Sequence, residues 1–147
     1  MTAETTLAAA ARREIEALHD FFGAWFRGDL DHEAFGRPVE TLGPSFRMVR
    51  PDGRELAREA VIDGVRSGHA SEPDDPPFEI LVRDQRVQWT SDDRCLVRYE
   101  EWQRSAGRWR GRRSTAAFVR DRSAPAGVVW SDLHETWIDG EDPPNPE

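Results

Sequence analysis

The hydrophobic pattern near the start of the chain is that of one long amphipathic helix. Between Thr6 and Arg27, large apolar residues recur at intervals of three or four, the spacing at which side chains share one helical face. Gly28 follows directly and marks the expected helix end, because glycine readily adopts the left-handed conformation that closes many helices. The apolar residues of this predicted face are Ile15, Leu18, Phe22, Trp25 and Phe26.

Shorter elements follow the long helix. Asp29 or Asp31 could cap a second, short helix that runs toward Arg37, after which Pro38 and the pair Gly43-Pro44 break the chain. The segments that come next are a strand, a proline-glycine turn and another helix that ends at Gly68. We place these three segments at Ser45 to Arg50, Pro51 to Gly53 and Glu55 to Ser67.

The pattern changes from helical to strand-like near Phe78. Four segments rich in Val, Ile, Leu and Trp are separated by short turn-forming links, which predicts an antiparallel meander. Helices followed by strands of this kind indicate an α+β domain with the helices on one antiparallel sheet. We expect one domain over residues 1–138 and a disordered acidic tail over 139–147. The four strands are predicted at Phe78 to Trp89, Arg94 to Arg104, Arg108 to Arg120 and Val128 to Ile138.

Charge and composition narrow the functional classes. The 147 residues carry a formal net charge of −8, which disfavours broad binding to nucleic-acid phosphates. All 20 basic residues are arginine, so a catalytic Schiff-base lysine is excluded. Cys95 is the only cysteine, and no two histidines have a zinc-like spacing. We therefore expect no cofactor and no metal.

The sequence also predicts a protein that is neither inserted into a membrane nor secreted. No stretch approaches the length of about 20 apolar residues that a membrane helix needs. The first residues lack the apolar core and cleavage site of a signal peptide. We expect a cytoplasmic location and no membrane partner.

Three short motifs resemble the nuclear transport factor 2-like superfamily, also called ketosteroid isomerase-like or cystatin-like. They are FRGDLD at residues 26–31, SFRMVRPDG followed by REAVIDGV, and WSDLHETW in the last strand. The resemblance covers about residues 8–138. It implies a curved sheet wrapped around the long helix as a cone, a small apolar ligand at the open end, and a homodimer through the convex face. Members include isomerases, dehydratases, polyketide cyclases and binding proteins, so the fold does not determine the function.

The resemblance also allows a test for isomerase chemistry. The isomerases place an aspartate base before a proline at the end of the first strand, and the matching residue here is Arg50. Their oxyanion-hole tyrosine on the first helix corresponds to Phe21. Both groups are missing, so the usual isomerase mechanism is not expected. An arginine at the base position suits a carboxylate or another anion instead.

Alternation along the strand from Arg94 places Tyr99 and Glu101 together with Cys95 and Val97. This face is apolar at its start and polar further along, as expected for a cone that is packed at its base and open at its mouth. Glu101 could act there as a general base, with Tyr99 as a hydrogen-bond donor. Alternatively, Glu101 pairs with an arginine on a neighbouring strand.

The last strand leaves two candidates open. Simple alternation places Glu135 on the more apolar face with Leu133 and Trp137, and it places His134 and Trp130 on the other face. A bulge between Ser123 and Val129 would instead turn His134 inward, as the resemblance implies. On the first helix, His19 lies on the apolar face, where it either lines the cavity or is a hydrogen-bonded core residue. Trp25 and Trp130 are further candidates for ligand contacts.

The sequence thus supports three functions. The first is a small-molecule-binding protein without enzymatic activity. The second is a cofactor-free isomerase, lyase or cyclase in which Glu101, His134 or Glu135 moves a proton. The third is a purely structural protein whose cone is filled by aromatic side chains.

Overall fold

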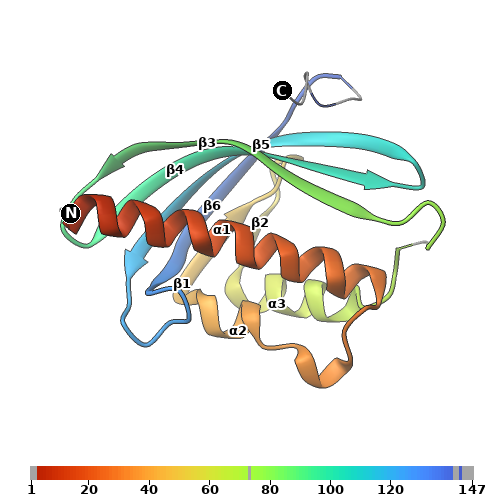
Figure 1. Cartoon of the computed structure of the whole chain (residues 1–147), viewed down its shortest axis with the longest axis horizontal. Coiled ribbons are helices and arrows are strands. Elements are labelled where there is room, and N and C mark those ends of the chain that lie inside the picture. Colours follow the sequence, from red (N-terminus) through yellow and green to blue (C-terminus); the bar gives the residue numbers. More distant parts are fainter. Residues whose placement is uncertain (1–2, 73, 141–142, 144–147) are drawn as a thin grey trace.

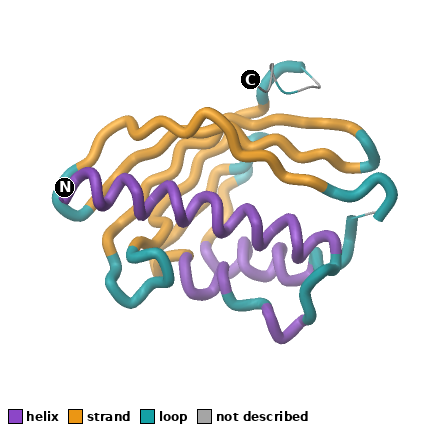
Figure 2. Tube along the Cα trace, viewed as in Figure 1, coloured by secondary structure: helices purple, strands orange, loops and turns teal. Residues whose placement is uncertain are grey.

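A computed structural model describes residues 3–72, 74–140 and 143. A curved six-stranded sheet lies over one long helix and two shorter ones (Figure 1). All helices lie on the same side of the sheet, so its other face is not covered by a helix (Figure 2). In chain order the elements are α1 (Ala3–Arg27), η1 (His32–Ala34), α2 (Arg37–Thr41), β1 (Leu42–Val49), β2 (Glu55–Ala57), α3 (Arg58–Ser67), β3 (Glu79–Thr90), β4 (Arg94–Ser105), β5 (Arg108–Arg120) and β6 (Val128–Trp137).

The strands lie in the order β2-β1-β6-β5-β4-β3. The predicted meander β3 to β6 is present, and all neighbouring pairs are antiparallel except β1 and β6, which run parallel. A parallel pair needs a long crossover connection. Here, α3 and the whole β3–β5 meander separate β1 from β6 in the chain. The α+β class with a curved sheet around the N-terminal helix is confirmed.

Helix α1 is held against the sheet by the apolar face that its periodicity predicts. Ile15 and Trp25 are fully buried, and Leu18 is 3% exposed. The helix ends at Gly28 as predicted, with φ +86°. The backbone N–H groups of Gly28 and Asp29 donate to the carbonyls of Trp25 and Ala24, which is the paired hydrogen bonding of a Schellman motif.

Three segments between α1 and β3 differ from the sequence-based expectation. β1 begins at Leu42 and continues through Gly43-Pro44, where a break was expected, and its pairing with β6 is irregular between Leu42 and Arg47. Only a 3-10 turn, η1, lies between Asp31 and Arg37, and the helix α2 begins at Arg37. Pro38 therefore lies inside a helix, where it is tolerated because first-turn N–H groups have no helical partner. The predicted helix from Glu55 begins at Arg58, since Glu55–Ala57 pair with β1 as the short strand β2.

A bulge in β6 determines which side chains face α1. Phe118 pairs with Trp130 but Ala117 pairs with Asp132, so Ser131 is an extra residue in the strand. The extra residue shifts the alternation, and Trp130 and Glu135 consequently both lie on the concave side. The bulge lies within β6 rather than before it.

Most of the tail predicted to be disordered, at positions 141–142 and 144–147, lies outside the described residues. The domain boundary at 138 therefore stays a prediction. Within the described part of the chain, no helix is both long and apolar enough to cross a membrane.

Candidate functional site

A cavity of about 150 Å³ lies between α1, α2, α3 and the concave face of the sheet. One end of it is polar, with side chains from α1, β4, β5 and β6: His19, Glu101, Gln103, Arg112 and Glu135. The remaining wall is apolar and is formed by Leu18, Phe22, Phe26, Pro38, Leu42, Phe46, Met48, Val61, Val65, Trp130 and Leu133. An apolar wall with a few convergent polar groups is typical of a small-molecule site.

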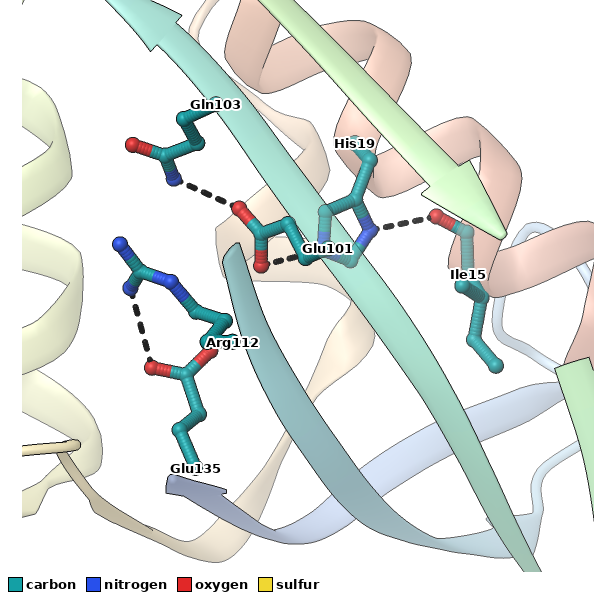
Figure 3. Close-up of polar contacts among 6 residues, drawn as sticks. All are labelled: Ile15, His19, Glu101, Gln103, Arg112 and Glu135. Atoms are coloured by element: carbon teal, nitrogen blue, oxygen red, sulfur yellow. Dashed lines mark hydrogen bonds and ion pairs between the residues drawn. The ribbon is translucent and has the colours of Figure 1, made fainter. Parts of the chain in front are cut away.

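His19 and Glu101 form a hydrogen-bonded pair at the polar end of the cavity (Figure 3). His19 Nδ1 lies 2.7 Å from the backbone carbonyl of Ile15, and Nε2 lies 3.1 Å from Glu101 Oε1. A carbonyl can only accept, so Nδ1 carries a proton and Nε2 shares a second proton with the carboxylate. Gln103 Nε2 donates to the other oxygen of Glu101 at 2.6 Å. Both oxygens of Glu101 are thus occupied.

Glu135 lies on the neighbouring strand with a single hydrogen bond. Arg112 Nη1 donates to Glu135 Oε1 at 3.2 Å, and no described residue donates to the second oxygen. Glu135 is only 3% exposed. Figure 3 shows the guanidinium of Arg112 pointing away from His19.

The environment shifts the pKa values of these groups in opposite directions. Burial alone would lower the pKa of His19, but the charge and hydrogen bond of Glu101 raise it above its ordinary value. Burial would raise the pKa of Glu101, yet His19 and Arg112 lower it to about 2. For Glu135, burial and the nearby charge of Glu101 outweigh Arg112 and raise the pKa to about 7. One carboxylate is therefore held ionised, and the other gains or loses a proton near neutral pH.

Three buried donors beside this polar end make no hydrogen bond of normal distance and angle among the described residues, although the Tyr99 and Ser114 hydroxyls lie close enough to interact with each other. They are the Tyr99 hydroxyl, the Ser114 hydroxyl and Arg112 Nε. Tyr99 and Ser114 are paired across β4 and β5, and Ser114 is paired with Glu135 across β5 and β6. Burial and the charges of Glu101 and Glu135 raise the pKa of Tyr99 well above its ordinary value, so its hydroxyl stays protonated. Buried donors without partners are uncommon in folded proteins and mark places where a ligand or water could bind.

A second hollow of about 240 Å³ adjoins the cavity at the mouth of the cone. The two spaces share a wall of five residues: Phe26, Met48, Val61, Val65 and Arg112. Arg50, Leu56, Ala60 and Gly64 complete the outer hollow. We call the two spaces the inner cavity and the outer hollow.

The structure places the residues proposed from the sequence in three different settings. His19, Glu101, Glu135 and Trp130 line the inner cavity, and Arg50 lines the outer hollow. Tyr99 is buried next to the cavity, with its ring 5.4 Å from that of His19. These residues come from α1, β4, β6 and the turn that follows β1, and the curvature of the sheet brings them together.

Trp25 and His134 lie elsewhere. Trp25 is fully buried, and its indole N–H donates to the Val65 carbonyl at 2.7 Å, so it joins α1 to α3. His134 is exposed on the convex side, opposite Thr115, because it alternates with the inward-facing Glu135. Neither residue lines the cavity.

Sequence reasoning did not single out Arg112, Gln103 or Glu14. Arg112 was available from the register, since a two-residue turn after Ser105 pairs Glu101 with Arg112. Glu14 is fully buried on α1, where it accepts hydrogen bonds from Arg37 at 2.6 Å and from the indole of Trp130 at 3.0 Å. No local pattern identifies such a network, because its three members come from distant segments.

The described residues contain no group of three or more His, Cys, Asp or Glu side chains arranged to hold a metal ion. His32 and His69 are neighbours, with ring centroids 4.1 Å apart, but no third ligand-type side chain among the described residues joins them in such a group.

The fold is that of the nuclear transport factor 2-like proteins. Within this class, the family described as sucrose-6-phosphate phosphohydrolase C-terminal matches residues 11–139, and the chain belongs to that family. No curated protein matches the sequence.

Several solved structures are similar to this chain and have the same fold. A nuclear transport factor 2-like protein of unknown function from Pseudomonas aeruginosa, PA1314, is 27% identical with a TM-score of 0.78, over 88% of this chain and 98% of that one. A cystatin-like protein from Caulobacter vibrioides is 13% identical with a TM-score of 0.67, over 89% of both chains. The hexachlorocyclohexane dehydrochlorinase LinA-type3 from Novosphingobium barchaimii is 13% identical with a TM-score of 0.60, over 95% of this chain and 93% of that chain. The last two share the fold alone.

Proposed function

We propose that the protein binds a small molecule in the inner cavity. The observation that carries this proposal is a hollow with apolar walls whose polar end holds buried donors without partners. Side chains that only fill a core are packed without such a gap and with their polar atoms paired. A space of about 150 Å³ is close to the size of an apolar cavity that accepts a single benzene ring.

Acid–base catalysis is the second candidate, and Glu135 favours it. This carboxyl has one free oxygen at the cavity and a pKa of about 7, which suits a group that takes up and returns protons near neutral pH. The Arg112 guanidinium lines the same cavity and would stabilise negative charge that develops on a substrate oxygen. The fold is compatible with catalysis, because a hexachlorocyclohexane dehydrochlorinase has it.

A ligand screen with two readouts tests both candidates. The panel consists of small ring and chain compounds, each present as a carboxylic acid and as the matching amide. A compound at about 100 times its Kd stabilises the folded state by roughly 2.7 kcal/mol, which raises the Tm of a domain of this size by about 5–10 °C. Each compound that raises the Tm is then incubated with the protein and followed by NMR, and conversion of the compound identifies an enzyme.

Two matched variants locate the binding site. Leu133→Trp places a large ring in the inner cavity, whereas Leu81→Trp places the same ring on the opposite face of the sheet, where Leu81 pairs with Trp102. We expect the ligand-induced rise in Tm to be lost in Leu133→Trp and kept in Leu81→Trp. Equal rises in the two folded variants, or no rise with any compound in the wild type, would contradict the proposal.

We also propose that the chain forms a homodimer through the convex face of the sheet. The support is that no helix covers this face (Figure 2) and that Trp89, which lies on it opposite Leu96, is 49% exposed. Exposed aromatic side chains are enriched at protein interfaces.

A further inference from the structure

We propose that the ligand is an amphipathic organic anion. Its apolar body fills the inner cavity, and its carboxylate or similar group lies in the outer hollow between Arg50 and Arg112. This inference rests on the proposed function, because it specifies the chemistry of a ligand at the same site.

The outer hollow combines an apolar wall with two cations and no acid. Its lining comes from α1, β1, β2, α3 and β5, and Arg50 and Arg112 are its only charged members among the described residues. On α1, by contrast, the buried carboxylate of Glu14 faces Arg37. Arg112 faces Glu135, which lies outside this lining, so the two guanidinium groups share one counter-ion. A site with more guanidinium groups than carboxylates is complementary to an anion.

Both arginines have hydrogen-bonding capacity to spare. Arg112 uses Nη1 for Glu135, while its Nε is buried and has no partner among the described residues. The side chain of Arg50 makes no hydrogen bond or ion pair within the described residues, although its backbone N–H closes the turn by donating to the Arg54 carbonyl. A guanidinium with two free N–H groups can hold a carboxylate with two parallel bonds.

The charges around the two spaces sum to a positive value. Glu101 and His19 neutralise each other, and Glu135 faces Arg112, so the charge of Arg50 is left over. When Glu135 takes up a proton, which its pKa of about 7 allows near neutral pH, the charge of Arg112 is left over too. Tyr99 stays neutral. A chain with a formal net charge of −8 thus has a local excess of positive charge in the lining of these two spaces.

The space limits the size of the ligand. The inner cavity holds roughly one six-membered ring, and the outer hollow of about 240 Å³ leaves room for a short linker and the anionic group. Because Arg112 lines both spaces, an anion beside it stays connected to a body in the inner cavity. A ring carrying a chain of one to three carbons and a carboxylate fits this description.

Matched acids and amides test the inference by titration calorimetry at low salt. The probes are phenylacetate, 3-phenylpropionate, 4-phenylbutyrate and hexanoate, each compared with its neutral amide, which has nearly the same shape. We expect at least one acid to bind tenfold or more tightly than its amide. Arg50→Gln should reduce this preference by about tenfold, which corresponds to roughly 1.4 kcal/mol, the scale of a charge-assisted hydrogen bond.

Arg54→Gln is the matched control. Arg54 lies in the same turn, carries the same charge and does not line the outer hollow, so its substitution should leave the preference unchanged. The inference is overturned if the amides bind as tightly as the acids, or if Arg50→Gln binds the acids like the wild type. If no probe of either kind binds, the proposed function itself fails; if amides bind and acids have no advantage, only the inference fails.

Discussion

At the scale of single residues, the two buried carboxylates of the cavity differ in what they are free to do. Glu101 accepts from His19 on one oxygen and from Gln103 on the other, so each oxygen already has a donor inside the protein. Glu135 accepts only from Arg112. We therefore expect any proton transfer to a ligand to involve Glu135, while the paired His19 and Glu101 orient the polar end of the cavity.

Glu135→Gln should make the protein more stable at alkaline pH. The folded carboxyl has a pKa of about 7, whereas an unfolded glutamate loses its proton near 4.3. Between these values the folded chain holds a proton that the unfolded chain releases, so wild-type stability falls as the pH rises. At 1.36 kcal/mol per pKa unit, the loss amounts to about 3 kcal/mol at pH 8. Glutamine removes this loss, and urea unfolding at pH 4.5 and pH 8 measures it.

An exposed glutamate supplies the control for this measurement. Glu33→Gln makes the same chemical change on η1, far from the cavity lining, and should leave the pH profile of unfolding as in the wild type. The prediction fails if Glu135→Gln changes the free energy of unfolding, relative to the wild type, by the same amount at pH 4.5 and at pH 8. The carboxyl would then not be held protonated by burial.

At the scale of elements, periodicity predicts most of the fold because each element buries one face. The spacing of Ile15, Leu18 and Phe22 predicts α1, and the alternation of Val97, Tyr99 and Glu101 predicts the concave face of β4. The bulge at Ser131 was not predictable, since it depends on how β6 fits between two neighbours rather than on its own sequence. That single residue explains why simple alternation placed Glu135 on the inner face correctly but Trp130 on the outer one.

Less of the candidate site than of the fold could be predicted from the sequence. Glu101, His19 and Glu135 stand out as polar residues on apolar faces, which is visible in a periodic pattern. The pairing of His19 with Glu101 joins residues 82 positions apart, so it requires the packing of α1 on β4. The partnership of Arg112 with Glu135 likewise needs the register of three strands.

Gly111 provides a prediction about how β4 and β5 pack against each other. Gly111 on β5 lies beneath Trp102 of β4, and a Cβ atom at position 111 would come within 2.6 Å of the indole ring. Gly111→Ala should therefore destabilise the protein by about 1–3 kcal/mol, the usual effect of overpacking. Chemical denaturation measures the change in the free energy of unfolding.

Gly64→Ala is the matched substitution in open space. A Cβ atom at position 64 meets nothing within 4 Å, and the residue lies inside α3. Alanine should stabilise this helix by about 0.5–1 kcal/mol, because glycine loses more backbone entropy on folding. If both substitutions changed stability in the same direction, contact with Trp102 would not be the reason for glycine at position 111.

At the scale of the whole molecule, the two faces of the sheet have different roles. The concave face buries α1 and surrounds the inner cavity, with Glu101, Ser114 and Glu135 withdrawn from water. The convex face carries exposed Arg98, Arg113 and His134 around Thr115. An antiparallel sheet tolerates water on one face. The polar centre and the exposed Trp89 of this face nevertheless match the mixed composition of a protein interface.

The proposed dimer predicts that one substitution at the centre of the convex face separates the subunits. Thr115 accepts a hydrogen bond from Arg98 and pairs with His134, so Thr115→Arg adds a cation where a two-fold axis would bring like charges together. Light scattering after gel filtration should give the mass of two chains for the wild type and of one chain, 16.8 kDa, for the variant. Ser67→Arg makes a comparable change at the exposed end of α3 and should remain dimeric. A wild type that has the mass of one chain at 100 μM, a concentration about a hundredfold above a typical micromolar Kd, would remove the case for this interface, and the convex face would then be a solvated surface.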